Sequence, residues 1–300
     1  MSTAKISKPI LGDKAYQVRA RAALPILVRQ ARAGVPIFYS DLAEELGMPN
    51  PRNLNYVLGS IGQSLEWLSK IWKVKVPPLQ CLVINKNTGL PGEGIGWFLV
   101  KKEDFSALPL RQKRVIVEAE LAHVFSFSRW NEVLKALSLE PVACDFSPIL
   151  KEASRVYGSG ESEDHKALKE YVARNPHVIG LGSNISVGVT EYRLPSGDTV
   201  DVSFSSKAVW IAAEIKSAIS AESDIVRGLF QCVKYRAVMD AVLLAEVHPQ
   251  VARAILVLGA KFPKSLIPLR NLLAIEVIDG IVPPANNQEC NPIHLTNTKK

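Results

Sequence analysis

The sequence predicts an α/β protein with two domains, and three observations carry this prediction. The chain has 300 residues, 47% of them hydrophobic, so it is long enough to bury two cores. Its first half repeats apolar residues at helical spacing. Its second half contains alternating and continuous apolar segments that are typical of strands, and a helical pattern follows them.

The first half opens with a helical pattern over Ala15–Ala33, which contains Pro25. A short helix is predicted over residues 41–46, with Ser40 as its N-cap. A longer helix with apolar residues at helical spacing begins near Pro51. A short helix, a tight turn and a longer helix together form a helix-turn-helix pattern.

Residues 77–100 contain two apolar segments around a turn rich in Gly, Pro and Asn, which predicts a β-hairpin. With the helices before it, this order resembles a winged helix over residues 1–102. The resemblance implies contact with nucleic acid at the start of the longer helix and at the hairpin tip. The residues concerned are Arg52, Asn53 and Asn55 on the helix and Lys86 at the tip. The alternative is a winged helix that contacts protein.

Residues 103–157 are predicted to form a helical connector between the two domains. The glycines and serine at 158–160, next to a polar stretch, mark the domain boundary. The second domain is therefore predicted over residues 158–282. Residues 283–300 lack periodicity and are predicted to form a tail.

Two strands with charged residues at their ends are predicted between residues 198 and 216. Alternation places Asp201 on one face of the first strand, whereas Glu214 and Lys216 leave the second strand on a single side. A hairpin turn centred on the Lys207–Ala208 bond would pair Asp201 with Glu214. Two carboxylates at that spacing repel each other unless a cation lies between them.

A helix is predicted after these strands, beginning near Glu222, with acidic residues in its first turn as the helix dipole favours. Arg227, Gln231 and Tyr235 recur every four residues along it and form one polar stripe. Because this helix directly follows the Glu-x-Lys strand, we expect the stripe to border the same cleft.

A further helical segment at residues 160–180 has an early Glu and a closing Asn-Pro, and it precedes the two strands. Together these segments resemble the PD-(D/E)xK nuclease superfamily, the restriction-endonuclease-like fold, with the NucS-type branch as the nearest likeness. The resemblance covers about the second half of the chain. It implies an α/β sandwich with a mixed central sheet. The chain departs from the superfamily's Pro-Asp pair, because Val200 precedes Asp201.

The resemblance implies a metal site of three acidic side chains. Asp201 and Glu214 would bind Mg²⁺, for which Mn²⁺ can substitute. Glu163 would supply the third acid from the first helix, with Glu161 as the alternative. Lys216 would orient the attacking water and offset the developing negative charge.

The helix after the strands is implied to assist this site. Gln231 would act in catalysis by supporting the site, or it would contact the phosphate backbone. Tyr235 and Arg227 would contact nucleic acid. Gln231 and Tyr235 come from the match to the superfamily's helix, whereas Arg227 comes from the polar stripe that it shares with them.

These parts predict a Mg²⁺-dependent endodeoxyribonuclease that hydrolyses DNA phosphodiester bonds in restriction or phage defence. The alternatives are a non-catalytic DNA-binding protein with a nuclease-like domain and a nuclease activated by a partner protein in a defence system. The expected partner is DNA, and many enzymes of this fold act as homodimers. The sequence leaves the recognition site and the strandedness of the DNA open.

Composition adds further expectations. The net charge is +7, and residues 1–75 contain 11 Lys and Arg against 5 Asp and Glu, which indicates a polyanionic partner for that segment. The four cysteines stand far apart, as in a reduced protein without a zinc site. With neither a signal sequence nor an apolar segment of membrane-spanning length in view, we expect a cytoplasmic protein without membrane contact.

Overall fold

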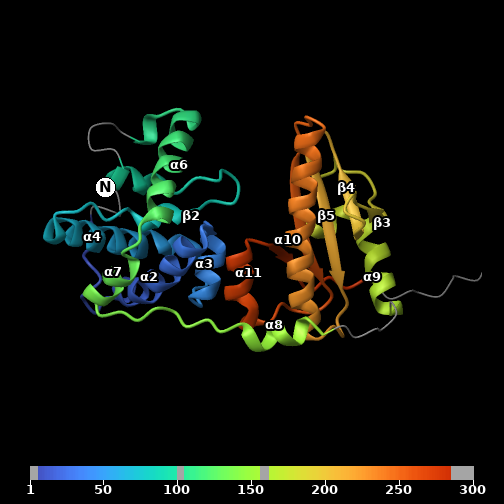
Figure 1. The fold of residues 1–300 in the computed structure, drawn as a ribbon, viewed down its shortest axis with the longest axis horizontal. Helices are drawn as coiled ribbons and strands as arrows, with labels where there is room; N and C mark the ends of the chain where they lie inside the picture. The colour runs from blue at the N-terminus through green and yellow to red at the C-terminus, as the bar shows by residue number, and fades with distance from the viewer. Residues whose placement is uncertain (1–5, 100–104, 156–161, 285–300) are drawn as a thin grey trace, which may run out of the picture. The chain divides into compact units, whose positions relative to one another are not determined.

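The computed structural model describes residues 6–99, 105–155 and 162–284 (Figure 1). The chain divides into two compact units. Unit 1 comprises the residues up to Glu152 together with Pro263–Ile275, and unit 2 comprises Ala153–Phe262 with the residues from Glu276 onward. The predicted boundary at residues 158–160 and most of the predicted tail lie outside the described residues. The chain is of the predicted α/β class.

Unit 1 is built mainly of helices around a large apolar core, in which α2 packs against α4. The predicted connector is not a separate element, because α6 and α7 place Val124, Trp130 and Leu134 in this core. These side chains cover apolar faces of the earlier helices, and this burial removes apolar surface from water. The main elements are α2 (Ala15–Ala33), β1 (Ile37–Phe38), α3 (Tyr39–Glu45), α4 (Leu54–Trp72), β2 (Val83–Ile84), α5 (Gly96–Leu99), α6 (Leu110–Ser126), α7 (Trp130–Ala136) and α8 (Ser147–Ala153).

The helix-turn-helix part of the prediction agrees with the structure, but the hairpin prediction is wrong. Ser40 lies inside α3, whose N-cap is Phe38. A short 3₁₀ turn at Pro51–Asn53 leads into α4. After the glycine-rich turn, the chain forms a 3₁₀ turn and α5 where a second strand was predicted. β2 instead pairs in parallel with β1, so its hydrogen bonds are satisfied without a hairpin partner.

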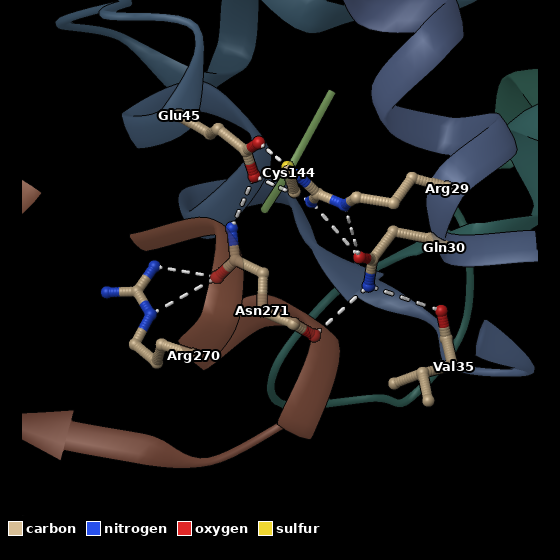
Figure 2. Close-up of polar contacts among 7 residues, drawn as sticks. All are labelled: Arg29, Gln30, Val35, Glu45, Cys144, Arg270 and Asn271. Carbon is tan, nitrogen blue, oxygen red and sulfur yellow. Dashed lines mark hydrogen bonds and ion pairs between the residues drawn. The ribbon is translucent and has the colours of Figure 1, made fainter. Parts of the chain in front are cut away.

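A segment from late in the chain completes unit 1. α11 (Ile267–Leu273) packs on α2 and α3, and a buried polar network holds it there (Figure 2). Asn271 Nδ2 donates to Glu45 Oε2 at 2.8 Å, and Gln30 Nε2 donates to the Asn271 carbonyl at 3.1 Å. Arg29 binds both oxygens of Glu45, at 2.6 and 2.9 Å. This helix was not among the elements predicted from the sequence.

Unit 2 contains a five-stranded sheet. It is mixed, as predicted. The strand order is β3-β4-β5-β6-β7, with antiparallel pairing from β3 to β5 and parallel pairing from β5 to β7. The strands are β3 (Val189–Arg193), β4 (Thr199–Ser205), β5 (Val209–Lys216), β6 (Val251–Leu258) and β7 (Glu276–Ile278).

Two helices cover opposite faces of this sheet (Figure 1). α9 (Glu163–Arg174) packs on the face that presents Phe204 and Ile215. α10 (Glu222–Ala245) connects β5 to β6 and packs on the face that presents Trp210. Because side chains alternate along a strand, Glu214 and Lys216 point to the α10 face while Ile215 enters the opposite core layer.

Candidate active site

The predicted register between β4 and β5 is confirmed. Ladder pairs run from Ser205 with Trp210 to Val202 with Ala213, as a turn at residues 207–208 requires. One residue further, the side chain of Asp201 joins the strands, because its Oδ2 accepts a hydrogen bond from the Ile215 N–H at 2.7 Å. Asp201 therefore lies beside the strand end that contains Glu214, although the ladder ends at Val202 and Ala213 and the predicted pair of Asp201 with Glu214 is not part of it.

The neighbouring edge strand, β3, has a strained residue opposite the same part of β4. Thr190 and Tyr192 of β3 pair with Val202 and Val200, and Glu191 between them has a φ of 54°. A left-handed φ is uncommon for residues other than glycine and costs about 1–3 kcal/mol, a strain that often occurs at functional sites. Glu191 forms an ion pair with Lys169 of α9, so its side chain points away from Glu214 toward the other helix.

Glu214 is a buried carboxylate with a partner on each oxygen. It is 2% exposed. Lys216 Nζ lies 2.6 Å from its Oε1, and the Tyr235 hydroxyl donates to its Oε2 at 3.1 Å. Burial, and then the charge of Asp201, raises the pKa of Glu214 to about 7, although Lys216 and Tyr235 act in the opposite direction.

One face of α10 is shaped to receive these side chains. A Cβ at Gly228 would lie 2.7 Å from Leu256 Cδ1 and 3.2 Å from Lys216 Cε, so the helix approaches β5 closely only because this residue is glycine. Sequence reasoning missed Gly228. A glycine within a helical pattern was the signal that could have revealed it.

Two members of the predicted polar stripe meet at the site. The Tyr235 hydroxyl also lies 3.0 Å from the Thr199 carbonyl, and Gln231 Nε2 lies 3.5 Å from that hydroxyl. Tyr235 is 2% exposed, so it holds Glu214 and does not offer a surface for a phosphate backbone. Arg227 lies apart from the cluster: it forms an ion pair with Asp224, and its Nη1 donates to the carbonyls of Ala153 and Arg155.

The first helix brings a different residue to the site from the one predicted. Glu163 is exposed at the start of α9. His165, in the same turn, has its Nε2 3.7 Å from Asp201 Oδ1. Glu161, the alternative acid, lies outside the described residues. The prediction took the early acid of the helix, whereas the helix rotation turns the histidine two positions later toward the sheet.

The residues predicted to contact DNA in unit 1 are accessible. Arg52, Asn53 and Asn55 are exposed where the 3₁₀ turn joins α4. Lys86 is exposed in the turn after β2. The exposed positions allow a polyanion to approach, although the hairpin that would have presented Lys86 is absent from the described structure.

The donor set in unit 2 fits Mg²⁺ through two carboxylates. The described residues contain no group of three or more His, Cys, Asp and Glu side chains that could hold a metal ion. Mg²⁺, however, commonly binds one or two protein carboxylates and completes its shell with water and substrate phosphates. Asp201 and Glu214 supply hard oxygen ligands, and the pKa of Glu214 is raised first by burial and then by the charge of Asp201, so a bound cation would favour its ionised form.

Comparison of the chain with protein-family models, with curated proteins and with solved structures finds no match. None of the helices in the described ranges is long and apolar enough to cross a membrane. Any functional assignment therefore depends on the residues and their geometry.

Proposed function

We propose that this protein is a metal-dependent endodeoxyribonuclease of the PD-(D/E)xK type, acting in restriction or phage defence. The observation that carries the proposal is the meeting of Asp201, Glu214 and Lys216 at the adjoining ends of β4 and β5. Glu214 is buried with a raised pKa, and such perturbed groups cluster at functional sites.

Each residue of the cluster has a distinct part in the proposed hydrolysis. Asp201 and Glu214 would hold Mg²⁺ or Mn²⁺. When bound, the ion supplies Lewis acidity toward the phosphate and lowers the pKa of an attacking water. The Ile215 N–H fixes the carboxylate of Asp201, and the Tyr235 hydroxyl fixes that of Glu214. Fixed ligands lose little orientational freedom on reaction.

Lys216 provides the positive charge that phosphodiester hydrolysis needs. Its ammonium group is held within the cluster by the 2.6 Å contact to Glu214, and its side chain is 16% exposed. A cation in this partly buried position stabilises negative charge on the phosphate more strongly than it would in water. His165, 3.7 Å from Asp201, is available to orient that carboxylate from the other side.

Unit 1 is proposed to bind the DNA substrate. The exposed Arg52, Asn53 and Asn55 lie at the start of α4, within the segment that has the basic surplus. Phosphate contacts of this kind position a protein on DNA, and their strength falls with salt. A homodimer would allow both strands to be cut.

The test is cleavage of supercoiled plasmid and of single-stranded DNA by the purified full-length chain in EDTA, Mg²⁺ or Mn²⁺. Asp201→Asn keeps the shape of the side chain and removes its charge. Asp198→Asn is the matched control, because Asp198 lies near the same strand end but pairs with Lys234 at 2.6 Å. We expect metal-dependent cutting by the wild type and the control, and none by Asp201→Asn. Equal cutting by all three proteins would refute the site.

A second candidate function is a DNA-binding protein that cuts only when a partner activates it, or not at all. The observation that favours it is that both oxygens of Glu214 already have protein partners. This alternative predicts DNA binding without cleavage under any metal. Fluorescence anisotropy with labelled duplex DNA, measured beside the cleavage assay, separates the two functions.

A further inference from the structure

Unit 1 contains a cavity of about 570 Å³ that the proposed nuclease chemistry does not use. It lies between the second half of α4 and α5, and Pro78 contributes to one wall. Trp97 and Phe98 of α5 supply aromatic surface, while Lys70 adds a positive charge at the rim. Its volume falls within the range of small-molecule sites.

A polar side chain lies immediately behind the cavity wall. Gln80 is 4% exposed. A Cβ at Gly62, which lines the cavity, would overlap both Gln80 Nε2 and Phe98 Cζ. The missing side chain at residue 62 therefore leaves the carboxamide next to the cavity, with the Phe98 ring over the same point.

The Gln80 carboxamide has unmet hydrogen-bonding capacity. Neither Nε2 nor Oε1 has a hydrogen-bond partner within the described part of the chain. Buried polar groups are nearly always paired, so an unpaired donor and acceptor at a cavity point to a ligand. Such a ligand must offer an acceptor and a donor side by side, because the carboxamide presents both on one edge.

We propose that this cavity binds an adenine ring, with Gln80 as the residue that recognises it. Glutamine pairs in a bidentate manner with adenine, donating to N7 and accepting from the N6 amino group. Trp97 and Phe98 offer faces on which a base stacks. Lys70 at the rim suits a phosphate attached to the base. Access to Gln80 requires the Phe98 ring to turn away from Gly62.

The adenine ring could come from a free nucleotide or from a base displaced from DNA. Asn55, one of the proposed DNA contacts, precedes Gly62 by seven residues on α4, so the two positions share one face, about 10 Å apart. DNA held at Asn55 would therefore lie near the cavity mouth. Both sources use the same edge of the ring, and the inference does not depend on nuclease activity.

Two binding measurements on the full-length chain test the proposal and separate the sources. The first is calorimetric titration with adenosine 5′-monophosphate, beside the guanosine, cytidine and uridine monophosphates. The second is anisotropy with a labelled duplex that has an adenine opposite an abasic site, beside the same duplex fully paired. Gln80→Met removes both hydrogen-bonding groups at similar volume. Gln112→Met is the matched control, because Gln112 is exposed on α6.

For a free nucleotide, we expect the adenine compound to bind best and at least tenfold more weakly to Gln80→Met, with Gln112→Met unchanged. For a displaced base, we expect the same tenfold loss only with the abasic duplex. Trp97→Leu, at a side chain that is 48% exposed, should weaken whichever ligand binds while the fold is kept. If neither probe shows binding that depends on Gln80, the carboxamide is merely hydrated and the proposal is wrong.

Discussion

Each unit contains a buried cluster of charged residues, and the two clusters have similar residues but differ in how their charges are paired. In unit 1, Arg29, Glu45 and Asn271 satisfy one another (Figure 2). Burial acts to lower the pKa of Arg29, but the hydrogen bond and charge of Glu45 outweigh it, so that pKa is raised. In unit 2, Lys216 pairs with Glu214, and burial together with the charge of Asp201 raises the pKa of Glu214 to about 7.

The difference lies in whether the charges balance without a ligand. The cluster around Glu45 is complete as it stands, since the guanidinium binds both carboxylate oxygens and the amide of Asn271 adds a third bond. The cluster around Glu214 has two carboxylates, Asp201 and Glu214, beside Lys216, and burial followed by the charge of Asp201 raises the pKa of Glu214, so a bound cation would stabilise its ionised form. We therefore expect mutations in the first cluster to change stability and mutations in the second to change chemistry.

The largest expected effect is on the stability of unit 1. Arg29→Met leaves Glu45 buried, 8% exposed, without its charged partner, and should lower the unfolding free energy by about 3–5 kcal/mol. Chemical denaturation measures it. Arg19→Met, exposed on the same helix, should change stability by less than about 0.5 kcal/mol. If the two variants were equally stable, the network of Figure 2 would not be what holds α11 in unit 1.

Lys216→Gln should change the rate of cleavage instead of the stability. If Lys216 faces the phosphate as proposed, removing its charge should slow cleavage by about 10²–10³-fold, while affinity for DNA stays the same. Lys234→Gln is the control, because Lys234 is an exposed lysine of α10 paired with Asp198. Single-turnover cleavage and anisotropy measure the two quantities. If the variant lost affinity for DNA but cleaved at an unchanged rate, Lys216 would act in substrate binding and not in catalysis.

The two clusters should also differ in how the free energy of unfolding depends on pH. The folded protein binds a proton at Glu214 more tightly than the unfolded chain, whose carboxyl has a pKa of 4.5. Its contribution to stability is therefore full below pH 4.5 and is lost as pH rises through about 7, a change of about 3 kcal/mol. Denaturation in EDTA should show this slope.

Glu214→Gln should flatten that slope, whereas the exposed Glu246→Gln should leave it intact. Mg²⁺ should stabilise the wild type more at pH 8 than at pH 5, because only the ionised carboxylate binds it well. A slope that survives in Glu214→Gln would assign it to another group. Glu214 would then not be the source of an electrostatic difference between the two clusters.

The elements that sequence reasoning predicted well depend on local patterns. The apolar run predicted β5, and the turn at residues 207–208 predicted the register of β4 and β5. The alternation predicted for β4 holds only in part, because Val202 and Phe204 enter the core beside α9 whereas Val200 enters the core beside α10. A two-residue side-chain period allows only one register that keeps the apolar residues in the core. The proximity of Asp201 to Glu214 followed from that register alone.

The misplaced elements depend on partners far away in the chain. Asn271 of α11 meets Glu45 across 226 residues, which no local pattern encodes. The second strand of the predicted hairpin became α5, because β2 finds its partner in β1. Glu163 was predicted at the site, but the rotation of α9 against the sheet brings His165 there, and only packing determines that rotation.

The smallest expected effect concerns Gln231. Its Nε2 lies 3.5 Å from the Tyr235 hydroxyl, at the limit of a hydrogen bond, so it supports Glu214 only through that tyrosine. Gln231→Met should slow cleavage by about threefold, equal to about 0.6 kcal/mol, and leave the melting temperature unchanged. Tyr235→Phe, which removes the direct bond to Glu214, should slow cleavage more. If Gln231→Met had the greater effect, Gln231 would contact the substrate itself, and the polar stripe of α10 would extend the active site.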